Sequence, residues 1–306
     1  MSLVPFIQQP PIARLLRANE VGGRFTSVVD AQLEYNRWNG EVVEVNDQLV
    51  TIPTTGWQLN NSDNLIDADG LDTGSPVSGS GIKYVYLSNA LASYLPESLA
   101  LSEQAPNDSV TSGQPYLGTS GNAANWRLIA VVYMVDDGIG NYVFRDSETQ
   151  RLVSHVENRI PRSLRGLPGY VNDNAQTAVV VANAAFAALS AASPPPGRVE
   201  FVQGYGPATA VLLSLDVAVV AGTAGAVSQW GIGVDSTTDP AVAAQVAAAA
   251  ANVAASCSYA FEPLTGYHYA LPLAQTGAGA TFAADTGRHG AAADVPATVL
   301  SGVVLA

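Results

Sequence analysis

Val299-Leu300-Ser301-Gly302-Val303-Val304-Leu305-Ala306 ends the 306-residue chain as an apolar run rich in valine. Valine favours extended backbone on a half-buried sheet, so we expect this run to pair as a strand. Before it come Gly266-Tyr267-His268-Tyr269, which also predicts a strand, and a turn at Gly287-Arg288-His289-Gly290. No catalytic signature accompanies these runs, and they indicate a rigid part of an assembly.

Further strands precede this ending, from about Arg198 onward. They are expected at Val199-Glu200-Phe201-Val202, Ala210 to Val220 and Trp230-Gly231-Ile232-Gly233-Val234, with glycine-rich turns between them. Short strands at this spacing predict a distal β-sandwich over residues 198–306, with a jelly-roll-like topology. The Ala-rich stretch 241–255 departs from this pattern, because Asp239 as N-cap and Pro240 at the first helical position predict a helix.

Residues 161–197 carry the prolines of a junction, at Pro161, Pro168 and Pro194-Pro195-Pro196. We expect this segment to be a linker. Within it, the small apolar residues from Thr177 to Leu189 suit either a strand or a helix. Packing against partner chains and packing in the chain's own core both remain open for them.

The first part of the chain predicts an N-terminal arm at 1–30 and an all-β body at 31–160. Gln8-Gln9-Pro10-Pro11 forbids regular structure in the arm. A hairpin is expected where Asn46-Asp47 separates two runs of period two, at 41–45 and 48–52. The other expected strands lie at 83–87, 99–102, 126–134 and 142–144, with a turn at Asp136-Asp137-Gly138.

Composition restricts the function classes. Hydrophobic residues make up 48% of the chain, which is enough to bury a core, and only 13% of residues are charged. The net charge of −13 disfavours nucleic acid and anionic membranes as partners. The one basic cluster, Arg159, Arg162 and Arg165, is interpreted as linker or interface contacts.

Targeting signals and cysteine chemistry are not apparent. No run approaches the 18 or so apolar residues of a spanning helix, so we expect no membrane insertion. The first residues lack the pattern of a secretion signal, and we expect a soluble chain without its own export signal. Cys257 stands alone, so no intrachain disulfide is expected.

Nothing in the sequence predicts catalysis, and we expect no catalytic residue, no cofactor and no enzyme activity. Gly231-Ile232-Gly233 lacks the third glycine of a dinucleotide loop. Asp136 and Asp137 are assigned to a turn, and Cys257 with His268 is disfavoured as a nucleophile and base. No glycosidase pair can be nominated among Asp146, Glu148 and Glu157, because they are scattered in the sequence. The two carboxylates of such a pair can, however, come together only in the folded protein.

A metal site is not expected either. Asp67-Ala68-Asp69-Gly70-Leu71-Asp72 could offer oxygen ligands to calcium, but with Gly70 at the invariant glycine the EF-hand register puts Leu65 and Pro76 at ligand positions. We interpret it as a solvated acidic loop in preference to a cation site. The histidines, His155, His268 and His289, show no short ligand spacing.

Aromatic side chains are the candidates for stacking on sugars. For Trp126 we favour core packing. For Trp57, in a polar loop, core packing and sugar stacking stay open. Trp38 and Trp230 are further candidates.

Two regions, 31–165 and 198–306, resemble bacteriophage virion proteins of the short trimeric fibre, spike and capsid-decoration type. The motifs that carry the resemblance are Tyr84 to Leu87, Leu99 to Ser102 with Ala105-Pro106, Tyr116 to Thr119, Asn125 to Tyr133, Phe144 to Asp146 with Asn158-Arg159, Gly266 to Tyr269, Gly287 to Gly290 and the apolar ending.

The resemblance implies a non-enzymatic homotrimer that is made in the host cytoplasm and located in the virion, with 161–197 as the trimer junction. Residues 1–30 would bind phage capsid or tail proteins, and the distal domain would point outward. Decoration of a capsid and receptor binding by a head or tail fibre, with a host surface glycan as a possible partner, both remain open. A glycan depolymerase and a secreted lectin are the alternative classes.

Overall fold

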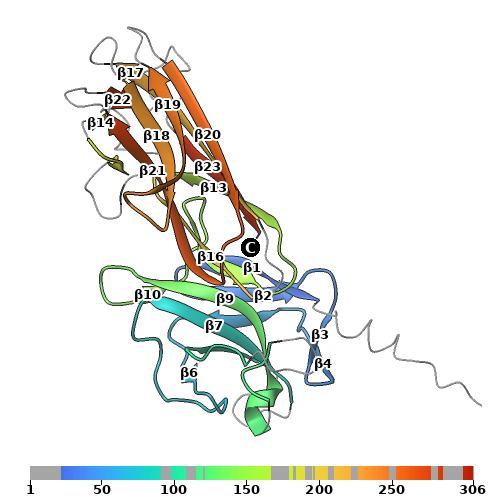
Figure 1. Cartoon of the computed structure of the whole chain (residues 1–306). Helices are drawn as coiled ribbons and strands as arrows, with labels where there is room; N and C mark the ends of the chain where they lie inside the picture. The colour runs from blue at the N-terminus through green and yellow to red at the C-terminus, as the bar shows by residue number, and fades with distance from the viewer. Residues whose placement is uncertain are drawn as a thin grey trace, which may run out of the picture. The chain divides into compact units, whose positions relative to one another are not determined.

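The structure is a computed structural model that describes residues 22–90, 98–107, 115–119, 121–166, 179–181, 184–189, 195, 197–205, 210–221, 227–247, 253–276, 282–284 and 299–305. In this part of the chain the elements are strands, together with one 3₁₀ turn, η1 (Gly121–Asn125), and no α-helix (Figure 1). The all-β prediction is confirmed.

The chain forms two compact units. Unit 1 comprises Met1–Phe144 and His155–Asn158, and unit 2 comprises Arg145–Ser154 and Arg159–Ala306. The chain therefore passes from one unit to the other three times, after Phe144, Ser154 and Asn158.

Unit 1 is built from two sheets and a hairpin. The smaller sheet has the order β1 (Gly23–Val29), β2 (Gln32–Arg37), β5 (Trp57–Asn60). The larger sheet runs in the order β10 (Tyr142–Val143), β9 (Trp126–Asp136), β7 (Gly81–Ser88), β8 (Leu99–Ser102), β6 (Leu65–Ile66). The short strand β12 (Val153–His155) has residues in both units.

The predicted hairpin is confirmed as β3 (Val42–Val45) and β4 (Gln48–Thr51). Asn46 and Asp47 have φ of 50° and 60°, the left-handed conformation that a tight two-residue turn requires and that Asn and Asp tolerate well. The turn is anchored because the Asn46 backbone N–H donates to the Tyr116 hydroxyl at 2.8 Å. Asn46 Nδ2 also donates to Asn125 Oδ1 at 3.0 Å.

Unit 2 contains two six-stranded sheets. One runs β11 (Gln150–Arg151), β16 (Val199–Gln203), β21 (Gly266–Thr276), β18 (Val227–Val234), β19 (Pro240–Ala247), with β15 (Ala187–Ala188) also paired to β21. The other runs β13 (Pro161–Gly166), β23 (Val299–Leu305), β17 (Val211–Ala221), β22 (Phe282–Ala284), β14 (Val179–Val181), with β20 (Val253–Phe261) paired to β17.

The order of the main strands is that of a jelly roll. Numbered along the chain, β13, β16, β17, β18, β19, β20, β21 and β23 give the order 1-8-3-6 in one sheet and 2-7-4-5 in the other. This is the pairing that two Greek keys produce. The terminal run is strand 8 of this order, and it lies between β13 and β17.

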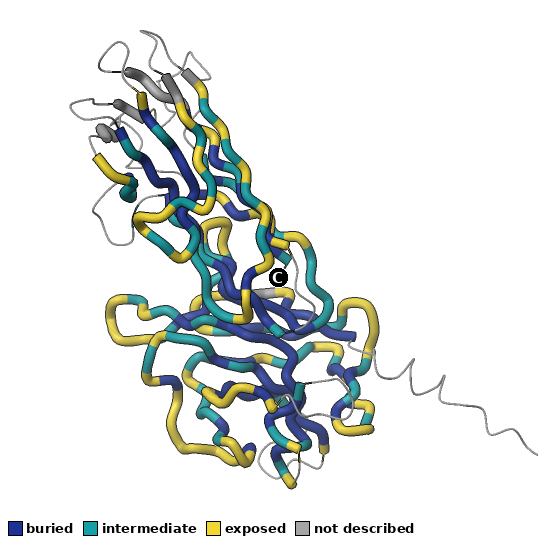
Figure 2. The backbone as a smooth tube through the Cα atoms, in the orientation of Figure 1, coloured by how far each residue is buried: buried dark blue, intermediate teal, exposed yellow. Residues whose placement is uncertain are grey.

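The two sheets of unit 2 share one hydrophobic core. Its members come from both sheets and include the fully buried Phe201, Trp230 and Leu300. Along β17 buried and exposed residues alternate, because Val211, Leu213, Leu215 and Val217 point into the core. Figure 2 shows the same distribution in both units, with buried positions along the strands and exposed positions mostly in the connections.

The predicted helix at 241–255 is wrong. Pro240–Ala247 is strand β19 and pairs with β18, and β20 begins at Val253. Alanine favours a helix locally, but Val242 and Ala255 pack against the core when the stretch is extended, and this tertiary packing overrides the local preference.

Two other segments differ from the sequence expectations. The segment 161–197 contributes β13, β14 and β15 to the sheets of unit 2, since Pro161 stands at the start of a strand, where a missing N–H is tolerated. Of the expected arm, residues from Gly23 to Val29 form β1, while residues 1–21 and the turn at 287–290 lie outside the described residues.

Candidate assembly surface

The outward face of the β13-β23-β17-β20 sheet is the candidate functional surface, and we name it the assembly face. The alternation that buries every second residue of β17 turns Leu212, Ser214 and Asp216 outward. Strand pairing places the other members beside them. The face consists of Pro161, Ser163, Arg165, Leu212, Ser214, Asp216, Ala254, Ser256, Ser258, Ala260, Val299, Ser301, Val303 and Leu305.

An apolar row crosses the centre of the assembly face. Leu212 is directly opposite Val303 on one side and Ala260 on the other. Leu212 is 53% exposed and Val303 is 39% exposed, although large aliphatic side chains are usually buried. In the next row Ser214 lies between Ser301 and Ser258, so the surface there is flat and lined by small side chains.

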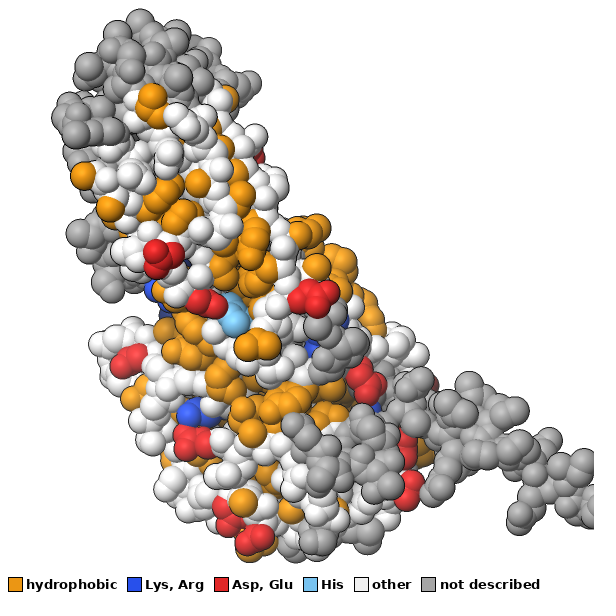
Figure 3. All heavy atoms as spheres, viewed as in Figure 1, with side chains coloured by type: hydrophobic (Ala, Val, Ile, Leu, Met, Phe, Trp, Pro, Cys, Tyr) orange, Lys and Arg blue, Asp and Glu red, His pale blue; other side chains and the backbone are white. Residues whose placement is uncertain are grey.

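The assembly face is electrically balanced in a strongly acidic chain. Its only charged members are Arg165 and Asp216, of opposite sign, whereas the whole chain carries a net charge of −13. On the side of the molecule drawn in Figure 3, acidic side chains stand singly or in small groups within uncharged and apolar surface. Two copies could therefore meet at the assembly face without the repulsion expected between acidic surfaces.

A second cluster in unit 2 surrounds His268 on β21. Its Nδ1 lies 2.7 Å from Asp235 Oδ2, and its Nε2 lies 2.7 Å from the Leu264 carbonyl oxygen. Asp235 Oδ1 also accepts the Tyr269 N–H at 2.9 Å. His268 lies on a strand, as predicted for Gly266-Tyr267-His268-Tyr269, and Asp235 is a partner that sequence spacing did not suggest.

An ion pair lies beside this cluster. Arg198 Nε is 2.9 Å from Glu200 Oε1, and its guanidinium lies 4.0 Å from the centre of the Tyr269 ring. Arg198 also donates to the Tyr267 hydroxyl. Burial, followed by the nearby Glu200 carboxylate, raises the pKa of Tyr267, so this hydroxyl stays neutral at ordinary pH.

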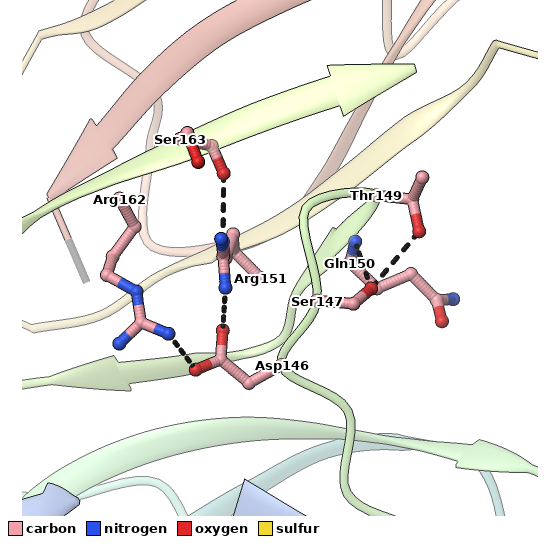
Figure 4. A network of polar contacts seen from close by, with 7 residues as sticks. All are labelled: Asp146, Ser147, Thr149, Gln150, Arg151, Arg162 and Ser163. Carbon is pink, nitrogen blue, oxygen red and sulfur yellow. Dashed lines mark hydrogen bonds and ion pairs between the residues drawn. The ribbon is translucent and has the colours of Figure 1, made fainter. Parts of the chain in front are cut away.

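The expected cluster of Arg159, Arg162 and Arg165 does not form one basic patch. Arg159 donates to the Tyr205 carbonyl, and Arg165 lies on the assembly face. Arg162 binds Asp146, whose other oxygen is 3.0 Å from Arg151 Nη1 (Figure 4). Because Arg151 Nε also donates to the Ser163 carbonyl at 2.9 Å, this network attaches residues 145–154 to β13.

The acidic loops use their carboxylates in turns. Asp67 Oδ1 accepts the N–H groups of Asp69 and Leu71 at 2.9 Å, and Asp72 Oδ1 accepts that of Gly74 at 2.7 Å. Asp137 does the same for Ile139 and Asn141. Hydrogen bonds, chiefly from the Asn141 side chain, lower the pKa of Asp137, which fits a turn and not a general acid.

The other candidate residues for chemistry are dispersed. Cys257 faces the core, with its Sγ 3.9 Å from the Trp230 carbonyl oxygen, and burial raises its pKa. His155 is buried against Phe25, with ring centres 5.3 Å apart. Glu157 binds Arg127 in unit 1, and Asp146 belongs to the network in unit 2. His289 lies outside the described residues.

The tryptophans divide into core and surface. Trp126 and Trp230 are fully buried, as expected for Trp126. Trp57 is partly buried and stacks on Tyr35, with ring centres 6.3 Å apart. Trp38 is 55% exposed, and the Arg24 guanidinium lies 5.3 Å from its ring centre.

Metal-binding clusters and membrane-spanning helices are both absent from the described residues. These residues contain no group of three or more His, Cys, Asp or Glu residues arranged to hold a metal ion. Across the same residues, no helix has the length and apolar character needed to cross a membrane.

Comparison with known proteins identifies no relative by sequence: no family model and no curated protein matches the chain. Among solved structures, the EclA C-terminal domain, a sugar-binding protein, is 15% identical, with 38% of this chain and 79% of that chain covered and a TM-score of 0.25.

Two further structures cover more of the chain. The match to the insecticidal delta-endotoxin Cry8Ea1 from Bacillus thuringiensis covers 93% of this chain and 51% of that chain, at 7% identity and a TM-score of 0.28. The match to a VP2 protein of infectious bursal disease virus covers 93% of this chain and 78% of that chain, at 10% identity and a TM-score of 0.23. The weak structural neighbours thus include a sugar-binding domain and a viral protein, and at these scores they identify no family.

Proposed function

We propose that the chain is a non-enzymatic structural component of a bacteriophage virion, a short head fibre, capsid decoration or tail spike. The observation that carries the proposal is the assembly face, a balanced and partly apolar sheet surface on a chain of net charge −13. Jelly rolls are common in proteins that build viral particles. The resemblance seen in the sequence supports the same class.

In this proposal three copies associate through their assembly faces. Leu212 and Val303 of each copy become buried, and Arg165 of one copy meets Asp216 of the next. In a closed symmetric assembly every copy of such a surface contacts another copy. An open assembly would leave the surface of its end copies exposed. Residues that precede Gly22 attach the trimer to capsid or tail proteins.

The test is the mass of the assembled protein in solution. We expect wild-type protein to sediment at about three times 31.6 kDa, and Leu212→Glu to sediment as a monomer with an unchanged β-sheet circular dichroism spectrum. The matched control is Ala243→Glu, which adds the same charge at an exposed position of β19, in the other sheet. Monomeric wild-type protein, or trimeric Leu212→Glu, would contradict the proposal.

Location is tested separately. Immunogold labelling of virions should place this protein on the particle, at the capsid or at the tail. If the label is found only in unassembled fractions, the virion assignment fails whatever the oligomeric state.

The exposure of Trp38 favours a second candidate, the binding of a host surface glycan. An exposed indole can stack on the apolar face of a sugar ring. We expect Trp38→Ala to reduce retention on host polysaccharide at least tenfold, with Trp57→Phe as the control that leaves the exposed ring in place. Equal retention of wild type and Trp38→Ala would remove this candidate.

A further inference from the structure

Both ring nitrogens of His268 face atoms that only accept hydrogen bonds. Nδ1 is 2.7 Å from the carboxylate Oδ2 of Asp235, and Nε2 is 2.7 Å from the carbonyl oxygen of Leu264. A neutral imidazole has one N–H and one lone pair, so it can satisfy only one of these two partners. The imidazolium form carries two N–H groups and satisfies both.

We propose that protonated His268 is a latch that holds the turn of residues 262–265, between β20 and β21, and that loss of its proton releases this turn. The inference concerns unit 2 alone and does not depend on the proposed virion function. It names a pH-sensitive element on the surface of the jelly roll.

The surroundings of His268 place one charged partner against the ring. Among the described residues, Asp235, from the connection between β18 and β19, is the one carboxylate bonded to the ring, and its side chain is 44% exposed. Phe201 of β16 stacks on the imidazole, with ring centres 5.6 Å apart, and brings no charge. On β16 the charges of Arg198 and Glu200 are paired with each other at 2.9 Å.

None of the other described neighbours places an unpaired charge against the imidazole ring, so Asp235 is the charged group that interacts with it. On β21 itself, Tyr267 has a raised pKa and stays neutral, and Tyr269 lies under Arg198. In the turn, Glu262 is exposed to solvent. The His268 side chain is 13% exposed, and an imidazole is the side chain that changes charge in the range of about pH 5 to 8.

Loss of the proton breaks one specific contact. The hydrogen bond to the Asp235 carboxylate is charge-assisted on its acceptor side, so the remaining proton stays on Nδ1. Nε2 then presents a lone pair to the Leu264 carbonyl oxygen, and two acceptors repel. The Leu264 side chain is 82% exposed and contributes little packing to hold the turn.

The release is confined to the turn. Asp235 stays attached to β21 in both states, because its Oδ1 accepts the Tyr269 N–H at 2.9 Å and its own N–H donates to the Tyr269 carbonyl at 3.0 Å. Pro263 is buried and limits how far the turn can move. The change therefore alters the position of Leu264 and leaves the sheet intact.

The experiment is NMR on the full chain with ¹⁵N-labelled histidine and leucine, from pH 5 to pH 8. The His268 signals are assigned by their loss in His268→Gln. We expect both ring nitrogens to be protonated at pH 5 and only Nδ1 at pH 8. The Leu264 amide signal should shift with the same midpoint, and its order parameter should fall as the turn is released.

Two variants separate the latch from ordinary effects of pH. In His268→Gln the Leu264 signal should no longer follow pH. In Asp235→Asn the neutral ring should no longer be held with its proton on Nδ1 alone, because the carboxylate that accepts this proton is gone. Three results would overturn the proposal: a neutral ring that carries its proton on Nε2, a ring with fewer than two protonated nitrogens at pH 5, or a Leu264 amide signal that stays constant while His268 changes its protonation.

Discussion

Arg127 and Glu157 form an ion pair of 2.7 Å between a strand of unit 1 and the short segment 155–158 that belongs to the same unit. The Arg127 side chain is 1% exposed, and its other terminal nitrogen donates to the Glu44 carbonyl of the β3–β4 hairpin. One buried guanidinium thus joins three parts of the sequence that lie far apart.

Replacing Arg127 should therefore destabilise unit 1. Arg127→Met fills part of the same volume but leaves the Glu44 carbonyl without its donor and Glu157 without its cation. We expect a loss of about 2 kcal/mol in the free energy of unfolding, measured with urea. Glu157→Gln, which keeps a hydrogen-bond acceptor, should cost about 1 kcal/mol, and equal stability of wild type and Arg127→Met would disprove the role.

Removing the carboxylate of Asp146 should destabilise unit 2. Asp146→Asn leaves Arg151 and Arg162 without an anion, and the side chain of Arg151 is only 9% exposed. The expected loss is about 2–3 kcal/mol in urea unfolding. The exposed pair Arg37 and Glu41 supplies the control, because Glu41→Gln should cost less than about 0.5 kcal/mol.

Gly70 and Gly74 allow backbone strain to be separated from a steric clash. Both have positive φ, +74° and +71°, but a Cβ at Gly70 would lie 2.5 Å from Trp126 Nε1, whereas one at Gly74 would meet nothing within 4 Å. We expect Gly74→Ala to cost about 1 kcal/mol and Gly70→Ala about 2–3 kcal/mol. Similar thermal shifts for the two variants would mean that the Trp126 contact is unimportant.

Alkaline pH should destabilise unit 1 through Tyr35. Burial raises its pKa in the folded state, so the unfolded chain releases this proton first as the pH passes about 10. The stability contributed by neutral Tyr35 is thus complete below pH 10 and falls above it, by about 1.4 kcal/mol per pH unit.

Tyr35→Phe isolates this effect, because the Tyr35 hydroxyl has no hydrogen-bond partner in the described structure. The variant should match wild type at pH 8 and lose less stability in urea unfolding between pH 10 and 11. A wild-type protein whose stability is constant over that interval would exclude the effect.

Truncation of the N-terminus tests the division of labour between attachment and assembly. The expected arm was 1–30, but Gly23–Val29 pairs with β2, so the deletion should stop at residue 21. We predict that the shortened protein keeps its sedimentation mass and no longer binds to virions. A deletion of 1–30, which removes β1, should by contrast lower the thermal unfolding temperature.

The predictions from sequence succeeded where local signals agree with tertiary packing. Asn46-Asp47 marks a hairpin because those residues tolerate the turn conformation, and the alternation from Val211 to Val217 follows directly from a sheet with one buried face. The same alternation already placed Leu212, Ser214 and Asp216 on one side, so the β17 part of the assembly face could have been found in the sequence.

The failures come from long-range pairing. Alanines at 241–255 favour a helix by themselves, and only pairing with β18 makes Pro240–Ala247 a strand. The register of Leu212 with Val303, 91 residues apart, and the bond from His268 to Asp235, 33 residues away, depend on which strands become neighbours. The local backbone preference of a residue does not determine which residues far away in the sequence become its neighbours.

The three passages of the chain between its units have a consequence for proteolytic damage. A cut after Phe144 leaves a second fragment whose residues 155–158 remain bound in unit 1 through Glu157 and Asn158. A cut after Asn158 leaves a first fragment whose residues 145–154 remain bound in unit 2 through Asp146 and Arg151. A nicked molecule is thus held together by exchanged segments.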